Sequence, residues 1–264
     1  MSLKAIVGRT GGKSKLRNKI RNMMPKHSTY VEPFVGGGSV FFAAPYDPLV
    51  KEVVNDKDKD IAQIYLDTKN VGDKYEGYTP VNKEGFKRLL NQKSFSSPLE
   101  RLKRNIILSR QSFRADRKSF APSKYNELMA RGSSGQRQAG GLSKFKERLK
   151  NTRILNQDYK SVIRKYDSPT TLFYLDPPYS TAKKAGDYKD NDLPIEELIN
   201  ILKSIKGKFI LSYDVNPLAK KLAREAGFKV MSVKTQYNAP PGQDIKDRVG
   251  NNMSMKTELI IRNY

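Results

Sequence analysis

The segment FYLDPPY, residues 173–179, places an acid, two prolines and a tyrosine directly after a short apolar run. Because neither proline can donate a backbone hydrogen bond, a strand that contains the run must end there. The carboxylate of Asp176 and a backbone carbonyl held by the rings of Pro177 and Pro178 then offer two fixed acceptors. Such a pair can receive both hydrogens of a planar amino group and favour the tetrahedral nitrogen that attacks an electrophile.

Tyr179 adds an aromatic ring beside these two acceptors. Stacking on such a ring contributes about 1–3 kcal/mol per base, which helps to hold a nucleotide that has left its duplex. Methylation of an adenine amino group by displacement on a sulfonium methyl needs no thiol or histidine nucleophile, and this chain has no cysteine and one histidine, His27. We therefore interpret the motif as the holder of an amino group during methylation, with a simple strand-ending turn as the alternative.

A glycine cluster, VGGGSVFF, follows the candidate strand segment TYVEPF. Glycines let the backbone turn sharply and let a ligand approach the main chain closely. Asp56 stands 20 residues after Gly36, at the end of the apolar segment EVVND, where an acid can bind ribose hydroxyls. Each signal alone has a plainer explanation, a tight turn for the glycines and a helix cap for Asp56. Together they indicate a cofactor that contains a nucleoside.

The segment TGGKSK, residues 10–15, ends like a phosphate-binding loop but does not complete that motif. The Walker pattern places four residues between its first glycine and the GK pair, and Val7 stands where that first glycine would be. Hydrolysis of a nucleotide is therefore not favoured. Gly12 and Lys13 still place flexible backbone and a cation after a candidate strand at 3–8.

The formal net charge of +23 is concentrated in two parts of the chain. Residues 1–31 carry eight lysines and arginines and no acid, and residues 83–153 carry 19 basic residues against five acids. A generally lysine-rich surface would not require such segregation. The pattern favours a polyanion as partner, and nucleic acid more than an anionic membrane.

Composition limits the remaining classes of protein. No apolar run approaches the roughly 18 residues of a membrane helix, so we expect a soluble protein with no membrane partner. Its expected location is the cytoplasm, or wherever the DNA is if the chain comes from a virus or phage. The absence of cysteine excludes disulfides, thiolate metal sites and the cysteine nucleophile of cytosine C5 methylation. A lone histidine cannot form a histidine cluster, and no metal is expected. The sequence carries no signal for a particular oligomeric state.

Short apolar runs alternate with amphipathic segments through most of the chain. Candidate strands lie at 30–34, 52–55, 153–155, 172–175, 208–213, 229–233 and 258–262, and candidate helices at 58–66, 159–166, 194–204 and 217–226. This alternation predicts an α/β fold with a mainly parallel sheet and helices on both faces. Ligands bind such sheets at the carboxyl ends of the strands.

The alternation is interrupted between residues 83 and 150. This part predicts helices at 84–91, 98–113 and 144–150, with the polar loop RGSSGQRQAGG before the last of them. We interpret 83–150 as a helical, basic insert in a catalytic core formed by 1–82 and 151–264.

The motifs TGGK, EPFVGGGS, NDKDKDI, NQDYKS, FYLDPPY and TELIIRNY occur in this order over nearly the whole chain. In order and spacing they resemble the Dam-type DNA adenine-N6 methyltransferases. The resemblance implies a Rossmann-like methyltransferase core, S-adenosylmethionine as cofactor, double-stranded DNA as partner and flipping of the target base. It also implies that the insert is a DNA-recognition region, which in this family commonly reads GATC, and it includes restriction-modification among the expected roles.

The resemblance assigns roles to individual residues. Lys13 and the glycine loop would line the methionine end of the cofactor, Asp56 would bind its ribose and Asp158 would face its adenine. The full set implied for the cofactor is Arg9, Gly12, Lys13, Phe34, Gly36, Gly37, Gly38, Asp56, Asp158 and Asp176. The set implied for holding and methylating the target base is Asp176, Pro177, Pro178 and Tyr179.

Two further groups follow from the resemblance. Ser212 and Asp214 resemble a strand end near the target base. The segment RQSFRADRKSFAP occupies the place of the family's DNA-contacting segment, so base or phosphate contacts are expected from Arg110, Arg114, Arg117 and Lys118. A solvated basic face is the alternative for this last group.

The chain departs from the family at two points, and two other functions remain open. Arg9 stands where the family usually has an aromatic residue, and the insert lacks the asparagine- and glycine-rich segment that follows the arginine in the family. One alternative function is methylation of an amino group on RNA or protein. The other is a catalytically silent DNA-binding protein with the same fold, although an intact DPPY segment argues against it.

Overall fold

The computed structural model describes residues 3, 5–8, 13–77, 79–121, 141–178, 193–237 and 254–264. The chain forms two compact units, Met1–Leu172 and Phe173–Tyr264. The first unit contains the glycine loop and the predicted insert, and the second contains the segment FYLDPPY.

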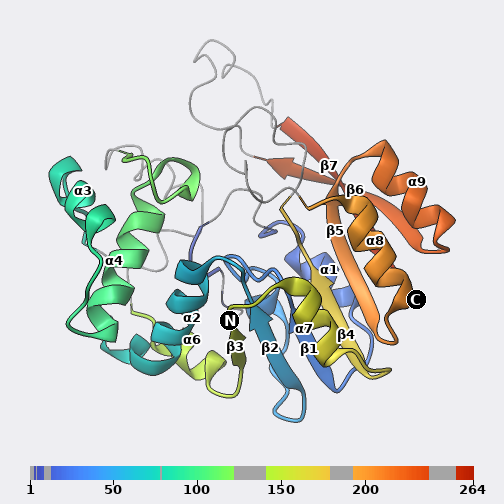
Figure 1. Ribbon diagram of the computed structural model, residues 1–264, viewed down its shortest axis with the longest axis horizontal. Coiled ribbons are helices and arrows are strands. Elements are labelled where there is room, and N and C mark those ends of the chain that lie inside the picture. The colour runs from blue at the N-terminus through green and yellow to red at the C-terminus, as the bar shows by residue number, and fades with distance from the viewer. Residues whose placement is uncertain are drawn as a thin grey trace. The chain divides into compact units, whose positions relative to one another are not determined.

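Three parallel strands form the sheet of the first unit (Figure 1). They are β1, Thr29–Glu32, β2, Lys51–Asn55, and β3, Arg153–Leu155, in the spatial order β3-β2-β1. In this register Val53 lies opposite Val31 on one side and Arg153 on the other. Because the strands are parallel, the residues that follow them meet at one edge of the sheet.

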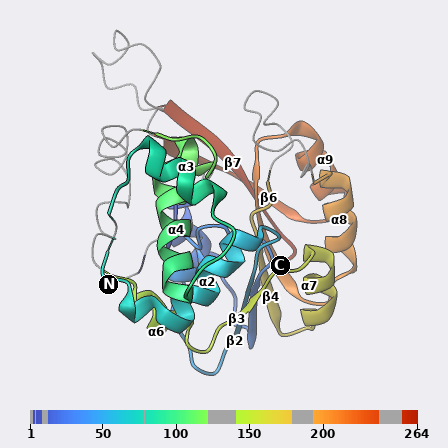
Figure 2. The ribbon, with the colours of Figure 1, turned by 60° about the vertical axis from the view of Figure 1, so that its left-hand side comes forward.

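The described part of the first unit also contains six helices. They are α1, Arg17–Met23, α2, Lys59–Val71, α3, Lys83–Asn91, α4, Pro98–Arg110, α6, Ser143–Leu149, and α7, Tyr159–Tyr166. Single 3₁₀ turns occupy η1, Phe41–Ala43, η2, Gly72–Lys74, and η3, Phe113–Ala115. The predicted insert therefore supplies α3, α4, η3 and α6, and Figure 2 shows α3 and α4 side by side.

Local sequence explains where these helices begin. Asp58 accepts hydrogen bonds from the first-turn amides of Asp60 and Ile61 and caps α2. Ser97 caps α4 by accepting from the amide of Glu100, with Pro98 at the first helical position, where its missing N–H costs nothing.

Two buried ion pairs join the helices to each other and to the sheet. The guanidinium of Arg101 on α4 donates to both carboxylate oxygens of Asp67 on α2, at 2.9 and 2.8 Å. Arg148 on α6 donates to both carboxylate oxygens of Glu52 on β2, at 2.5 and 2.6 Å. Asp67 and Glu52 are buried, so each arginine compensates a charge that water cannot reach.

The second unit has a mixed sheet covered by two helices. Its strands are β4, Thr171–Leu175, which begins at the end of the first unit, β5, Lys208–Asp214, β6, Lys229–Tyr237, and β7, Ser254–Arg262, in the order β4-β5-β7-β6. Strand β7 is antiparallel to both β5 and β6. The helices α8, Ile195–Ser204, and α9, Pro217–Glu225, lie side by side (Figure 1).

The predicted α/β class with a mainly parallel sheet is confirmed, and each candidate strand from residue 30 onward overlaps an observed strand. The candidate strand at 3–8 is wrong for the residues described there, because Ile6 and Val7 form a bend. They are buried, and Ile6 donates a single backbone hydrogen bond to the Gly37 carbonyl at 2.9 Å, which replaces a strand ladder. The division into core and insert stays a prediction.

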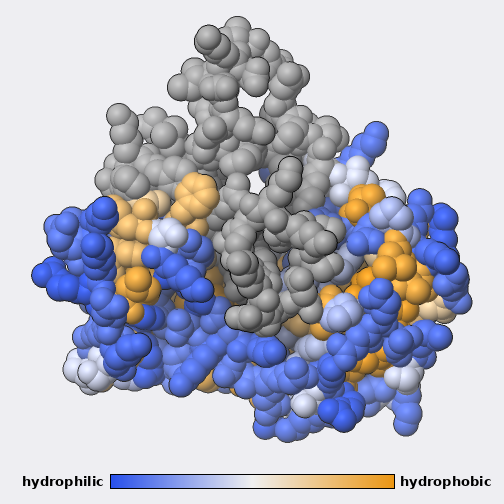
Figure 3. All heavy atoms as spheres, turned by 45° about the horizontal axis from the view of Figure 1, so that its top comes forward, coloured by the Kyte–Doolittle hydropathy of each residue, from blue (hydrophilic) through white to orange (hydrophobic). Residues whose placement is uncertain are grey.

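The visible surface of the described residues is largely hydrophilic, with hydrophobic residues gathered in a few smaller areas (Figure 3). Among the helices that the structure describes, none combines the length and apolar character that crossing a membrane requires. Within the same residues, no three His, Cys, Asp or Glu side chains are grouped as a metal ion would require.

Candidate functional site

The glycine loop after β1 is shaped by contacts inside the first unit. Gly38 has a φ of +73°, and a Cβ added there would overlap the Tyr65 hydroxyl and the ring of Phe42. A Cβ on Gly37 would overlap the backbone carbonyl of Val7. The hydroxyl of Tyr65 also donates to the Gly36 carbonyl at 3.2 Å. The protein's own packing therefore requires glycine at positions 37 and 38, whether or not a ligand approaches this loop.

Asp56 joins this loop to the end of β2. It is buried, and one carboxylate oxygen accepts the backbone N–H of Gly36 at 2.9 Å. The other oxygen accepts the backbone N–H of Asp58, also at 2.9 Å. An ionised carboxylate only accepts hydrogen bonds, so hydroxyl groups and backbone N–H groups are its natural partners. The structure thus places Asp56 where the sequence predicted and gives it a structural role as well.

Asn55, the last residue of β2, ties together the ends of all three parallel strands, and the sequence analysis missed it. Its side-chain amide donates to the carbonyls of Pro33 at 2.9 Å and Gln157 at 3.0 Å. Its side-chain oxygen accepts the backbone N–H of Gln157 at 2.9 Å. The available signal was a buried polar residue at the last position of an apolar strand, directly before Asp56.

Asp158 and Phe34 meet at the same edge of the sheet through Tyr159. Asp158 is exposed and caps α7 by accepting from the amide of Lys160 at 2.9 Å. The next residue, Tyr159, places its ring 5.1 Å from that of the half-buried Phe34. The carboxylate belongs to the residue directly before one of two packed aromatic rings, and these groups together suit a planar heterocycle that carries an amino group.

Lys13 is the predicted N-terminal cofactor residue that the structure describes. It is 2 % exposed, and its backbone carbonyl accepts from the amides of Leu16 and Arg17, at the start of α1. The sequence therefore located a buried cation in the first unit. Arg9 and Gly12 lie outside the described residues.

The segment Asp176 to Pro178 leaves the end of β4 in the second unit. All five residues of β4 are buried, Pro177 is buried, and Asp176 and Pro178 are half-buried. The strand stops at the prolines, as their missing N–H groups require. Tyr179 lies outside the described residues.

A polar layer lies on β5 beside β4. The hydroxyl groups of Tyr174 and Ser212 are 3.0 Å apart and both residues are buried. Asp214 ends β5 and lies opposite Glu258 of β7, which is fully buried. The sequence singled out Ser212 and Asp214 but missed Glu258, since pairing between strands so distant along the chain has no local signal.

The four predicted DNA contacts fall on or just after the end of α4. Arg110 is the last residue of α4 and half-buried, and Lys118 is exposed. Arg117 pairs its guanidinium with the carboxylate of Asp58. Arg114 lies in η3, and only its backbone is described. The segment is closed by a backbone β-bridge between Ser112 and Phe120.

The charge of Arg110 also acts on a buried tyrosine, Tyr75. Burial raises the pKa of Tyr75 above its ordinary value, and the neighbouring charge of Arg110 opposes that shift.

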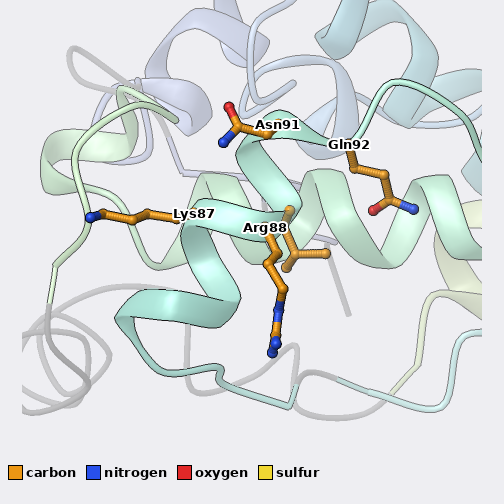
Figure 4. Close-up of a pocket in the computed structure, with 5 residues that line it drawn as sticks. Lys87, Arg88, Asn91 and Gln92 are labelled. Atoms are coloured by element: carbon orange, nitrogen blue, oxygen red, sulfur yellow. The ribbon is translucent and has the colours of Figure 1, made fainter.

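A shallow hollow on α3 is lined by Lys87, Arg88, Leu89, Asn91 and Gln92, four of which are labelled in Figure 4. All five residues belong to one helix or follow it directly. None of the residues predicted to hold the cofactor or the target base lines it, so it is no candidate for the chemistry.

Comparison with known proteins decides the family. A sequence profile described as "D12 class N6 adenine-specific DNA methyltransferase" matches residues 10–239. The chain belongs to this family. The expectation of DNA adenine methylation, drawn from the order and spacing of the motifs, is confirmed, and methylation of RNA or protein is not supported.

Three curated relatives show how the D12-class chain compares with individual enzymes. It is 23 % identical to "Type II methyltransferase M.MjaIII" of Methanocaldococcus jannaschii, with all of both chains covered. It is 25 % identical to "Type II methyltransferase M1.LlaDCHI" of Lactococcus lactis subsp. cremoris, with 97 % of this chain and 93 % of the relative covered. It is 22 % identical to "DNA adenine methylase" of Escherichia coli K12, over 75 % of this chain and 73 % of that one.

Proposed function

We propose that this D12-class enzyme transfers a methyl group from S-adenosylmethionine to the N6 nitrogen of an adenine that has been flipped out of duplex DNA. The observation that carries the proposal is Asp176 with its two prolines at the end of the buried strand β4, in a chain of this family. The place of action is that of the DNA substrate, the cytoplasm or whichever compartment holds the DNA.

The residues at the carboxyl ends of β1, β2 and β3 fit an adenosine-containing cofactor. The buried carboxylate of Asp56, at the end of β2, can accept hydrogen bonds from ribose hydroxyls, and the exposed Asp158 can accept from an adenine amino group. The rings of Phe34 and Tyr159 offer an apolar wall. Lys13 and the loop from Gly36 to Gly38 would face the methionine part. When bound, S-adenosylmethionine supplies an electrophilic methyl group on a sulfonium.

The target adenine would be held by the residues that follow β4. The Asp176 carboxylate and a carbonyl of the Pro177-Pro178 turn accept the two N6 hydrogens, which localises the nitrogen lone pair for attack. Tyr179 stacks on the base and offsets part of the cost of unstacking it from the duplex. The new N–C bond would form as the bond between the methyl carbon and the sulfonium sulfur breaks, which would leave S-adenosylhomocysteine as a neutral thioether. The N6 proton on the side that the Asp176 carboxylate faces would then pass to that carboxylate or to solvent.

The segment after α4 is proposed to contact the DNA. Arg110, Arg114 and Lys118 supply positive charge for phosphates or guanine edges on one short stretch of chain. The function of Arg117 within this segment is treated in the next subsection. GATC is the first target sequence to test because it is common among Dam-type enzymes.

Mass spectrometry of nucleosides tests the proposed reaction. Unmethylated duplex DNA is incubated with the protein and S-adenosylmethionine labelled in its methyl group, then digested to nucleosides. We expect labelled N6-methyladenine from the duplex and none from an RNA of the same sequence. Duplexes that differ in a single GATC site then show whether this sequence is the target. A folded protein that methylates no duplex DNA would support the catalytically silent DNA binder.

A further inference from the structure

Arg117 directs its positive charge to the start of α2 within the first unit. Its guanidinium pairs with Asp58 and lies 3.6 Å from a carboxylate oxygen of Asp60. The Arg117 side chain is 17 % exposed. Lys118, the next residue, is exposed. We call RQSFRADRKSFAP, residues 110–122, the recognition segment. Two of its adjacent cations therefore have different surroundings, since Arg117 faces acids of the same unit and Lys118 faces solvent.

Asp58 connects this ion pair to the acid proposed to bind the cofactor. One of its carboxylate oxygens accepts from the first-turn amide of Asp60 at 3.0 Å, and the other faces Arg117. Its backbone N–H donates to Asp56 at 2.9 Å, and the second carboxylate oxygen of Asp56 holds Gly36. A continuous set of contacts thus runs from Arg117 through Asp58 and Asp56 to the glycine loop.

The backbone of the recognition segment has an unusual conformation at Arg117, the residue that pairs with Asp58. Arg117 has a φ of +59° and Ala115 a φ of +58°, a left-handed conformation that residues other than glycine rarely adopt. The Arg117 N–H donates to the Ser112 hydroxyl at 2.8 Å, while Asp116 accepts from the amide of Lys118 at 2.8 Å. Such unusual conformations persist only where the surrounding contacts enforce them.

A second arginine fixes the acidic first turn of α2 from another direction. Arg104 on α4 lies 3.7 Å from Asp60, and its guanidinium donates to the Leu89 carbonyl at 2.9 Å. Burial lowers the pKa of Arg104, and the Asp60 charge opposes this shift. Asp60 is therefore shared by two arginines, and Asp58 pairs with Arg117.

We propose that Arg117 is a positioning residue that fixes the cofactor-binding carboxylate Asp56 through Asp58, and so couples the DNA-recognition segment to the cofactor site. The proposal rests on the proposed function, because it takes Asp56 to be a cofactor contact. Coupling of this kind is reciprocal, so DNA that engages the recognition segment alters cofactor affinity by the same factor with which cofactor alters DNA affinity.

Calorimetric titration with S-adenosylhomocysteine in the absence of DNA tests the proposal. We expect Arg117→Gln to raise the Kd at least about fivefold, the lower end of typical coupling between sites. Asp58→Asn keeps an oxygen that can cap α2 but loses the charge, and it should raise the Kd similarly. The double variant should bind S-adenosylhomocysteine no more weakly than the weaker of the two single variants, since both changes remove the same ion pair. Arg117→Lys should restore part of the affinity.

Arg101→Gln is the matched control. This arginine also pairs with an acid of α2, Asp67, but Asp67 lies in the last two turns of that helix. We expect Arg101→Gln to lower the melting temperature while leaving the Kd of the folded protein within about twofold, because sites without shared partners act independently.

The outcomes are distinguishable. No binding by the wild-type protein would overturn the cofactor assignment and this proposal with it. Wild-type binding with an unchanged Kd in folded Arg117→Gln would overturn the proposal alone, and a loss of DNA affinity in that variant would then make Arg117 a plain DNA contact. If Arg117→Gln does not fold, Asp58→Asn decides by the same criterion.

Discussion

The carboxylate of Asp56 accepts a hydrogen bond of 2.9 Å from the backbone N–H of Gly36, so the acid that ends β2 fixes the loop that follows β1. Asp56→Asn should therefore weaken cofactor binding for two reasons. The variant loses the negative charge at the ribose, and its side-chain NH2 group must face one of the two backbone N–H groups that Asp56 now accepts. Since a buried unsatisfied group costs about 1–3 kcal/mol, we expect the Kd for S-adenosylhomocysteine to rise about tenfold or more. Calorimetric titration checks this.

Asp47→Asn is the control for that variant. Asp47 also accepts a backbone N–H, from Leu49 at 2.9 Å, but in an exposed turn. Its substitution should leave the Kd unchanged. Equal binding by Asp56→Asn and the wild type would remove Asp56 from the cofactor site.

The glycine loop predicts a large stability difference between two Gly→Ala substitutions. Gly38 and Gly227 both have positive φ, +73° and +76°, but an added Cβ meets open space at Gly227 and overlaps Tyr65 and Phe42 at Gly38. Gly227→Ala should cost about 1–2 kcal/mol, the left-handed backbone alone, and Gly38→Ala about 2–5 kcal/mol. Urea denaturation of both variants measures the difference. Equal losses would mean that the loop can move away from α2.

The buried pair of Arg148 and Glu52 should respond strongly to loss of one partner. Arg148→Met leaves the Glu52 charge buried without its bidentate partner, and we expect a loss of about 3–5 kcal/mol in the free energy of unfolding. The double variant with Glu52→Leu should lose less, because no charge remains buried. For the exposed pair of Lys221 and Glu225, Lys221→Ala should cost less than about 1 kcal/mol.

The start of α4 should lose stability in acid. Hydrogen bonds from Ser96 and Gln92 hold the pKa of Glu100 below its ordinary value of 4.5. A carboxyl whose pKa is lower in the folded protein stabilises the fold above its unfolded pKa and loses that effect as the pH falls through the folded pKa. The melting temperature of the wild type should exceed that of Glu100→Gln at pH 7, and the difference should shrink below about pH 4.5. Ser96→Ala should make that difference smaller, and a pH-independent difference would contradict the assignment.

Local sequence was sufficient to predict most helices and strands, because the apolar runs and caps that define each element lie within a few residues of one another. The predicted ends of elements were wrong where a residue distant in the chain determines them. The helix predicted at 98–113 ends at Arg110, since the side chain of Gln111 donates to the Val81 carbonyl and accepts the Val81 amide, both at 2.8 Å. Strands β6 and β7 extend beyond their apolar parts because polar residues such as Lys234 and Thr257 pair with each other.

The candidate site shows the same division. The sequence located its motifs, because DPPY indicates a particular chemistry and because the glycine cluster and Asp56 indicate a cofactor when they are taken together. It did not show that Phe34 and Tyr159 pack together, or that Arg117, predicted as a DNA contact, pairs with Asp58 59 residues away. Such contacts depend on the parallel order of the strands and on the path of the insert.

Lys118, an exposed cation of the recognition segment, should make a simple electrostatic contribution to DNA binding. Lys118→Ala should weaken binding similarly for all duplex sequences and reduce the slope of log K against log salt by about 1, as expected for one phosphate contact. Lys221→Ala, at an exposed lysine of α9 outside residues 83–150, is the control. An unchanged slope for Lys118→Ala would exclude a phosphate contact.

The central claim is that Asp176 holds the adenine amino group during methyl transfer. The most direct test compares the wild type with Asp176→Ala by mass spectrometry of nucleosides from duplex DNA, with binding of S-adenosylhomocysteine and the melting temperature measured on both proteins. We expect N6-methyladenine from the wild type, and at least about a hundredfold less from a folded, cofactor-binding Asp176→Ala protein, as for loss of a single charge-stabilising contact in other enzymes. Comparable N6-methyladenine from both proteins would contradict the account.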